Sequence, residues 1–362
     1  MIMDYPQKVS TNYYLKQSGI DYPKDGLRFY DVRNAPFAIY GLMDYEDGKP
    51  FRRMPWEIAY NASKDVYCRH TQTSGGRVRF ATDSDKIAID VRFPALEDRP
   101  MLTLTANSGF DLCVIENGKE QFVHSYEPAI DAVDGYTTIF KFQDRKLREL
   151  TLYFPLYQDV SDLKIGLAED AVVAEAAGYT IKKPLLFYGS SITQGASACR
   201  PSLSFAALIA RRFDADFINL GFASGCKAEP EMLEYLKTVK SSVYILDYDH
   251  NSPNPEYLEK THYAAYKSYR DVNPDTPIIL VTRGSCTPDA PDIVARREVI
   301  RNTYTRAKKD GDEKVWFVDG SQFFATEDPY ECTIDSVHPN DLGHHRMAKF
   351  IGQTVAIALE NA

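Results

Sequence analysis

The stretch LLFYGSSITQG, residues 185–195, joins a continuous apolar run to small residues and hydroxyls. An apolar run of this kind is typical of a strand that is buried on both faces, as in a parallel sheet. Four similar runs follow, at residues 216–221, 242–248, 277–282 and 314–320. The stretch therefore predicts the first strand of a parallel sheet, which ends where Ser190 and Ser191 stand side by side.

Helical patterns lie between these apolar runs and after the last of them. They occupy residues 204–213, 230–239, 256–272 and 294–309, and a final pattern follows Pro339. Five alternating strand and helix units of this length predict a three-layer α/β/α domain of the flavodoxin-like kind.

The preceding part of the chain, from residue 26 to about 170, has a period of two. In DKIAIDVRF, residues 85–93, Ile87, Ile89 and Val91 fall on one face of the expected strand. Turn signals such as Asn117-Gly118 separate several such segments. This pattern predicts an all-β sandwich or jelly roll, with no helix of useful length.

The two patterns divide the chain into two domains. Residues 168–179 form the expected junction, so the sequence predicts a β-sandwich domain at 1–178 and an α/β domain at 179–362. A length of 362 residues is also too great for one compact core.

Composition excludes several classes of partner. The net charge is −9 and basic residues form no block, which argues against nucleic acid and anionic membranes. The first residues, MIMDYPQKVS, have no apolar segment of signal-peptide length, and no 18-residue apolar run follows. The six cysteines form no CxxC pair, so neither a disulfide framework nor a metal site is expected. These features together predict a cytoplasmic protein.

The carboxyl ends of the predicted parallel strands are where a ligand is expected. Ser191 lies at the first of these ends, just before a helix, where free N–H groups and the helix dipole favour a nucleophile. A serine nucleophile needs a base, and the base needs an orienting group. His338 meets this need because Asp335 precedes it by three residues, although an Asp-x-x-His pair also fits an ordinary surface turn.

Two further loops are candidates for an oxyanion hole. Asn251, after the third strand, can offer a side-chain N–H, and the loop GFASG at residues 221–225 can offer a main-chain N–H. A loop rich in turn-forming residues is the alternative interpretation of Asn251.

Taken together, these stretches resemble the SGNH (GDSL-like) hydrolase superfamily of serine esterases, and in particular its two-domain bacterial carbohydrate esterases with an amino-terminal jelly roll. The resemblance rests on four blocks and on the sandwich segments. The blocks are FYGSSITQGASACRPS, NLGFASGCKAEPE, LDYDHN and TIDSVHPNDLG, and the sandwich segments are RFYDVRNAPFAIYGL, TSGGRVRFATDS and LYFPLY.

The resemblance implies a role for each matching residue. Ser191 becomes the nucleophile, His338 the general base and acid, and Asp335 its orienting partner. The main-chain N–H of Ser191 and the side chain of Asn251 become oxyanion donors, and the second block supplies another N–H. Equal loop length gives that N–H to Ser224, with Gly225 one position beyond. Position 190 is Ser, where many members have Asp.

The nearest layouts in this superfamily are intracellular esterases that deacetylate plant oligosaccharides, mannan fragments among them. The resemblance thus implies an O-acetylated oligosaccharide as the substrate, with no metal and no cofactor. An acyltransferase that uses the same site and a non-catalytic carbohydrate-binding protein are the alternatives. A phosphate-binding loop at GSSITQG is disfavoured, because both the G-x-G-x-x-G pattern and the terminal Gly-Lys of a P-loop are missing.

One aromatic segment of the sandwich half is a candidate for binding the sugar. The stretch FRRMPWEIAYN, residues 51–61, contains Trp56 and Tyr60. If the sandwich overhangs the catalytic edge, these rings would form a platform for the substrate. The alternative is that Trp56 only fills the interface between the domains.

Overall fold

A computed structural model describes residues 24–43, 45–46, 49–97, 99–130 and 132–361. The first 23 residues lie outside the described residues. They include MIMDYPQKVS, the stretch that contains no apolar segment of signal-peptide length. None of the helices in the described ranges is both long and apolar enough to span a membrane.

The amino-terminal half is an antiparallel β-sandwich, as the alternating pattern predicted. One sheet has four strands, in the order β1 (Leu27–Asp31), β9 (Asp162–Ala168), β4 (Lys86–Arg92) and β7 (Gly135–Lys141). The other has six strands: β10 (Val173–Ala174), β3 (Arg77–Thr82), β8 (Arg148–Tyr153), β5 (Phe110–Glu116) and β6 (Lys119–Tyr126) in order, with β2 (Ala38–Tyr40) paired to β3. Ile87, Ile89 and Val91 all point into the core between the sheets.

The carboxyl-terminal half contains a parallel sheet of five strands. Its order is β12 (Ala215–Gly221), β11 (Ile181–Gly189), β13 (Val243–Asp247), β14 (Ile278–Val281) and β15 (Val315–Val318). Numbered along the chain this order is 2-1-3-4-5, which is the flavodoxin-like arrangement. The predicted fold class is confirmed.

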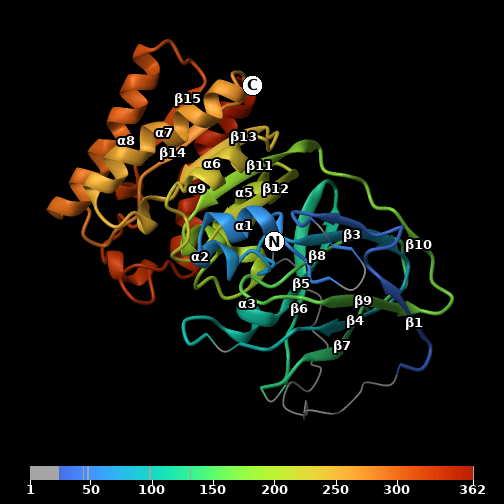
Figure 1. The fold of residues 1–362 in the computed structure, drawn as a ribbon. Coiled ribbons are helices and arrows are strands. Elements are labelled where there is room, and N and C mark those ends of the chain that lie inside the picture. Colours follow the sequence, from blue (N-terminus) through green and yellow to red (C-terminus); the bar gives the residue numbers. More distant parts are fainter. Residues whose placement is uncertain (1–23, 44, 47–48, 98, 131, 362) are drawn as a thin grey trace.

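Helices cover both faces of this sheet (Figure 1). Side chains of β11 alternate between two cores: Leu185 and Phe187 pack toward α5 and α9, whereas Leu186 and Tyr188 pack toward α6, α7 and α8. The bounds are α5 (Phe205–Arg212), α6 (Pro230–Leu236), α7 (Pro255–Val272), α8 (Pro291–Lys309) and α9 (Asp341–Glu360), with short 3₁₀ turns at η2 (Pro201–Leu203), η3 (Asp249–Asn251), η4 (Gly320–Gln322) and η5 (Pro329–Cys332).

The sequence predicted no helix of useful length in the sandwich half, and the helices found there are short. This half contains α1 (Trp56–Ala62), α2 (Lys64–Tyr67) and α3 (Leu104–Ser108), of 7, 4 and 5 residues. Helices of one or two turns are too short to show a periodic pattern. Their signals are instead side-chain caps, since Ser63 begins α2 and Thr103 begins α3.

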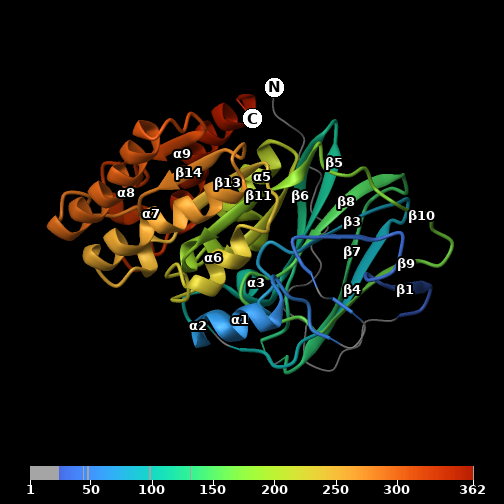
Figure 2. The same ribbon diagram turned by 45° about the horizontal axis from the view of Figure 1, so that its top comes forward.

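The two halves share a continuous interface. Arg53 and Arg77 come from the sandwich half, are fully buried, and donate at 3.1 Å to the carbonyls of Asn219 and Phe217 on β12. These arginines occupy carbonyl groups of an edge strand that would otherwise lack partners. α1 and α2 also pack into the core beneath α6, where the two halves meet (Figure 2).

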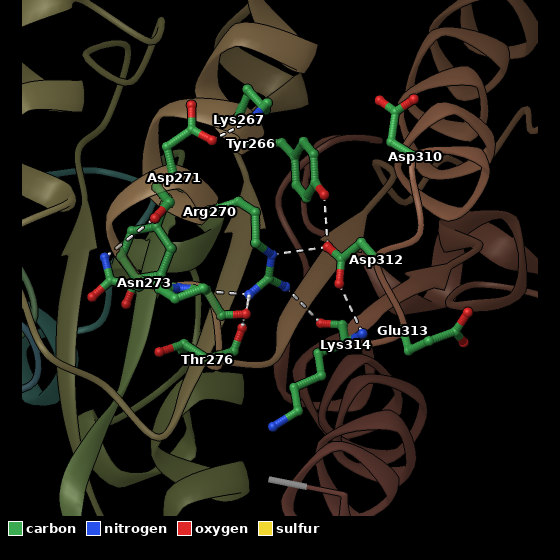
Figure 3. A network of polar contacts seen from close by, with 12 residues as sticks. Tyr266, Lys267, Arg270, Asp271, Asn273, Thr276, Asp310, Asp312, Glu313 and Lys314 are labelled. Carbon is green, nitrogen blue, oxygen red and sulfur yellow. Dashed lines mark hydrogen bonds and ion pairs between the residues drawn. The ribbon is translucent and has the colours of Figure 1, made fainter.

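At the amino-terminal edge of the parallel sheet, Arg270 of α7 binds the loops that lead into β14 and β15 (Figure 3). Its guanidinium donates to a carboxylate oxygen of Asp312 at 2.9 Å and to the carbonyl of Lys314 at 2.9 Å. It also donates to three carbonyls in the turn after α7, those of Asn273, Pro274 and Thr276. All three guanidinium nitrogens are therefore hydrogen-bonded.

Candidate active site

A tight turn presents the candidate nucleophile. β11 ends at Gly189, the side chain of Ser190 accepts a hydrogen bond from the N–H of Ile192 at 3.1 Å, and Ser191 is the first residue of α4 (Ser191–Gln194). A β-carbon at Gly189 would collide with the hydroxyl of Thr193. The small residues at the end of this strand are thus required by close packing of the turn against the strand.

The structure brings the three predicted catalytic side chains together at the carboxyl-terminal edge of the sheet. Ser191 Oγ lies 3.0 Å from His338 Nε2, and His338 Nδ1 lies 2.7 Å from Asp335 Oδ2. Both distances are within hydrogen-bonding range. An imidazole held in this way can take the serine proton and later return it to a leaving group.

The loop before α9 holds Asp335 against His338. The backbone N–H groups of His338 and Val337 donate to Asp335 Oδ1 at 2.7 and 3.1 Å. Burial alone would raise the pKa of Asp335, but these hydrogen bonds and the imidazole lower it below its usual value. The carboxylate therefore stays ionised beside the ring. Asn340 then caps α9, as its position after Pro339 suggested.

Donors for a negatively charged oxygen surround the serine. In the part of the chain that the structure describes, neither the N–H of Ser191 nor that of Ser224 has a protein acceptor. The N–H of Gly225 donates to the carbonyl of Phe222 at 2.9 Å, so this N–H is already used. Asn251 Nδ2 donates to the same carbonyl at 2.9 Å, which fixes the amide and leaves its second hydrogen free to donate elsewhere.

Two residues that hold this turn were not singled out in the sequence. The amide of Gln194 donates to Gln72 Oε1 at 2.6 Å and accepts from the N–H of Ala223 at 3.0 Å. The hydroxyl of Tyr157 donates to the carbonyl of Ser191 at 3.0 Å. Gln194 lies within GSSITQG and Tyr157 within LYFPLY, so both stretches were noticed without a role for these side chains. Through them the sandwich half positions the nucleophile.

A buried carboxyl group lies behind the nucleophile turn. Thr193 Oγ1 donates to Asp247 Oδ2 at 2.9 Å, at the end of β13. Burial raises the pKa of Asp247 to about 8, and the neighbouring Asp249 adds to this effect, whereas the Thr193 hydrogen bond opposes it. Asp247 is thus largely protonated at neutral pH.

The candidate sugar-binding rings are on the surface. Trp56 is 45% exposed, Tyr60 is 64% exposed and Tyr67 is 41% exposed, so Trp56 does not simply fill the domain interface. Adjacent rings in this series pack edge to face, with centroids 6.2 and 5.5 Å apart. Of these rings, Tyr67 belongs to α2, and α2 lies beside the loop that carries Ser224, because a β-carbon at Gly225 would come within 3.3 Å of the α2 backbone.

The other histidines differ from His338 in their surroundings. His262 bonds to Thr303 at 2.9 Å, and His70 contacts the carbonyl of Tyr67. His344 is buried and lies 2.9 Å from the carbonyl of Ala196. Across the described ranges, no group of three or more His, Cys, Asp or Glu side chains could hold a metal ion.

Comparison with known families assigns both halves of the chain. Residues 182–356 match the GDSL-like Lipase/Acylhydrolase family. Residues 27–173 match a family described as the N-terminus of SGNH hydrolase-type esterases. No curated protein matches the chain.

Solved structures share the whole two-domain arrangement. A protein from Bacteroides ovatus, described as a GDSL-like lipase, is 27% identical, has a TM-score of 0.84, and the match covers 93% of this chain and 99% of that one. The salicylyl-acyltransferase SsfX3 from a tetracycline biosynthetic pathway is 22% identical, with a TM-score of 0.75 and the same coverage.

A third structure is an acetyl xylan esterase from the rumen bacterium Butyrivibrio proteoclasticus. It is 15% identical, has a TM-score of 0.59, and the match covers 92% of this chain and 99% of that one. At this identity the likeness concerns the fold alone. The chain is therefore an SGNH/GDSL-like hydrolase, in which a GDSL-like lipase/acylhydrolase domain follows an N-terminal antiparallel β-sandwich domain.

Proposed function

We propose that this protein is a serine esterase that removes O-acetyl groups from plant-derived oligosaccharides, with acetylated manno-oligosaccharides as one candidate class. The observation that carries the proposal is the hydrogen-bonded series Ser191–His338–Asp335, with distances of 3.0 and 2.7 Å, next to free N–H donors. This arrangement suits acyl transfer through a covalent serine intermediate.

The reaction would proceed in two steps. Ser191 Oγ attacks the acyl carbonyl while His338 Nε2 accepts the proton, and the N–H groups of Ser191 and Ser224 and the amide of Asn251 stabilise the oxyanion. His338 then protonates the leaving sugar hydroxyl. A water molecule then loses a proton to His338 and attacks the acyl-enzyme, and His338 returns this proton to Ser191 Oγ as acetate leaves. Asp335 orients the imidazole and stabilises its charged form.

Two observations support a sugar ester as the substrate. The exposed series Trp56, Tyr60 and Tyr67 lies on α1 and α2, and α2 packs beside the loop that carries Ser224. Exposed aromatic rings suit the apolar faces of sugar rings. The same two-domain fold occurs in a protein described as an acetyl xylan esterase. We further propose that the protein acts in the cytoplasm and uses no metal or cofactor.

The test is a panel of acetylated oligosaccharides followed by mass spectrometry. We expect mass losses of one acetyl group at a time with wild-type protein and none with Ser191→Ala. A panel in which no member loses acetyl groups, while the protein hydrolyses p-nitrophenyl acetate through Ser191, would contradict the proposed substrate but not the esterase chemistry.

An acyltransferase is the second candidate, because the same fold occurs in a salicylyl-acyltransferase. In that case an alcohol replaces water in the second step. Adding a sugar or other alcohol acceptor to the assay separates the two: a transferase forms a new ester at the expense of free acid, whereas an esterase continues to release acid.

A further inference from the structure

Arg283 is a cationic residue at the catalytic edge that takes no part in the mechanism above. Arg283 follows the end of β14 by two residues, so it lies at the same edge of the sheet as Ser191. Its backbone N–H donates to Asp249 Oδ2 at 3.0 Å, which ties it to the turn that carries Asn251. Three residues later, Cys286 Sγ lies 3.5 Å from the carbonyl of Pro329, in the loop that leads to the catalytic histidine.

Among the described residues, the guanidinium of Arg283 has no hydrogen-bond or ion-pair partner. Its Nε is buried without a hydrogen bond, and no carboxylate of the described residues lies within ion-pair distance of the side chain. Burial lowers the pKa of Arg283, and the nearby Arg296 acts in the same direction, against the attraction of Asp249 and Asp292. A partly buried cation without a partner is costly in a folded protein.

The nearest carboxylates already serve another arginine. Asp249 Oδ1 lies 3.3 Å from Arg296 Nη1, and Asp292 Oδ2 accepts from Arg296 Nε at 2.7 Å. Asp249 Oδ2 accepts the backbone N–H of Arg283, as described above. The carboxylates of Asp249 and Asp292 are thus bound by Arg296 and by the backbone N–H of Arg283. The guanidinium of Arg283 can therefore bind an acceptor outside the protein.

His250 stands beside Asp249 in the same turn, and the charges of Arg283 and of the catalytic histidine both act on it. Both ring nitrogens of His250 are buried and have no hydrogen-bond partner among the described residues. Its pKa is well below the ordinary value, chiefly because of burial, and the positive charges of Arg283 and then His338 lower it further. His250 therefore lies within electrostatic reach of both. It stays neutral. Arg296 is paired with Asp249 and Asp292, so among the described residues Arg283 is the arginine on this side of the site whose charge has no carboxylate partner.

We propose that Arg283 binds a carboxylate carried by the ester substrate. A guanidinium binds a carboxylate through two parallel hydrogen bonds, which supplies both charge and orientation. The carboxylate can belong to the alcohol, as in an O-acetylated uronic acid residue, or to the acyl group, as in a half-ester of a dicarboxylic acid. This proposal rests on the esterase function and adds that the enzyme prefers anionic esters within its substrate class.

Two matched substrate pairs test the proposal and distinguish the two sources. The first pair is an O-acetylated hexuronic acid and the O-acetylated neutral hexose of the same configuration. The second pair is p-nitrophenyl succinate and p-nitrophenyl acetate. We expect wild-type protein to favour the anionic member of one pair by about 10- to 100-fold in kcat/KM, the range of a charge-assisted hydrogen bond.

Variants assign that preference to the arginine. Arg283→Gln should remove the preference mainly through KM and leave p-nitrophenyl acetate hydrolysis unchanged, and Arg283→Lys should keep part of it because the charge remains. Arg306→Gln is the matched control, since Arg306 is an exposed arginine near the far end of α8. It should leave the preference intact.

Two outcomes would overturn the proposal. One is wild-type protein without preference in either pair; the other is an equal loss on neutral and anionic esters in Arg283→Gln, which would assign Arg283 to packing. Failure of the esterase function gives a different result: Ser191→Ala then has no effect on the hydrolysis of either p-nitrophenyl ester, or neither ester is hydrolysed.

Discussion

The two edges of the parallel sheet differ in whether certain polar groups are hydrogen-bonded within the protein. At the amino-terminal edge, Arg270 donates to five protein acceptors and closes the loops around it. At the carboxyl-terminal edge, Arg283 has no such acceptor within the described residues, and the N–H groups of Ser191 and Ser224 also lack one. Saturated polar groups stabilise a fold, whereas unsatisfied ones are available to a substrate. The difference separates the structural edge from the reactive edge.

The largest expected effect is at the carboxyl-terminal edge. Ser191→Ala should lower kcat by about 10⁴-fold on p-nitrophenyl acetate, because the nucleophile is lost while the oxyanion donors remain. His338→Ala should have a similar effect. The circular dichroism spectrum and melting temperature should stay close to wild type. A well-folded Ser191→Ala protein with near wild-type activity would show that the reactive group lies elsewhere.

The amino-terminal edge should respond in stability instead of activity. Arg270→Ala removes five hydrogen bonds, and Asp312 keeps only the donors Tyr266 and Lys314. We therefore expect a loss of about 3 kcal/mol in the free energy of unfolding. Urea denaturation measures this loss. Arg306→Ala on neighbouring α8 is the control. A large fall in kcat at temperatures where Arg270→Ala is folded would contradict the separation of the edges.

A single oxyanion donor should contribute less than the nucleophile. Asn251→Ala should lower kcat by about 10²-fold with little change in KM, because its hydrogen bond to the reacting oxygen strengthens in the transition state. The measurement is steady-state kinetics on p-nitrophenyl acetate. If KM alone rises, Asn251 binds the substrate in its ground state and is not one of the oxyanion donors.

The exposed aromatic rings should affect large substrates only. Trp56→Ala should raise KM for an acetylated oligosaccharide by about 5-fold, since a stacked ring contributes roughly 1 kcal/mol. Hydrolysis of p-nitrophenyl acetate should be nearly unchanged. Equal losses on both substrates together with a lower melting temperature would show that Trp56 acts by packing.

The last prediction concerns the pH dependence of stability. Asp247 is protonated up to about pH 8 in the folded protein, whereas an unfolded aspartate loses its proton near pH 4. Between these values the folded state holds the extra proton, so this group lowers stability as pH rises, and its contribution levels off above pH 8. Asp247→Asn cannot ionise and should show a smaller fall in melting temperature over that window. An identical pH profile in both proteins would mean that Asp247 is already ionised when folded.

Much of the fold followed from the period of the apolar residues. The run before Ser191 predicted a buried parallel strand, and the structure places its side chains in two cores on opposite faces of the sheet. The helices α1 and α2 were not predicted, because their few residues show no period. α1 packs against α6 and α2 lies beside the Ser224 loop, and no local pattern in the sequence records either contact.

By itself the sequence determined which residues are candidates for the reaction. Asp335 and His338 are three residues apart, so a single loop can join them, and Ser191 stands at a strand end where the sheet must present it. Only the tertiary structure decided that Gln194 and Tyr157 connect the nucleophile turn to the sandwich half. It also decided that the guanidinium of Arg283 forms no ion pair with a carboxylate of the described residues. The reason is physical: local spacing fixes contacts within a turn, whereas whether a charge finds a partner depends on side chains brought together from distant segments.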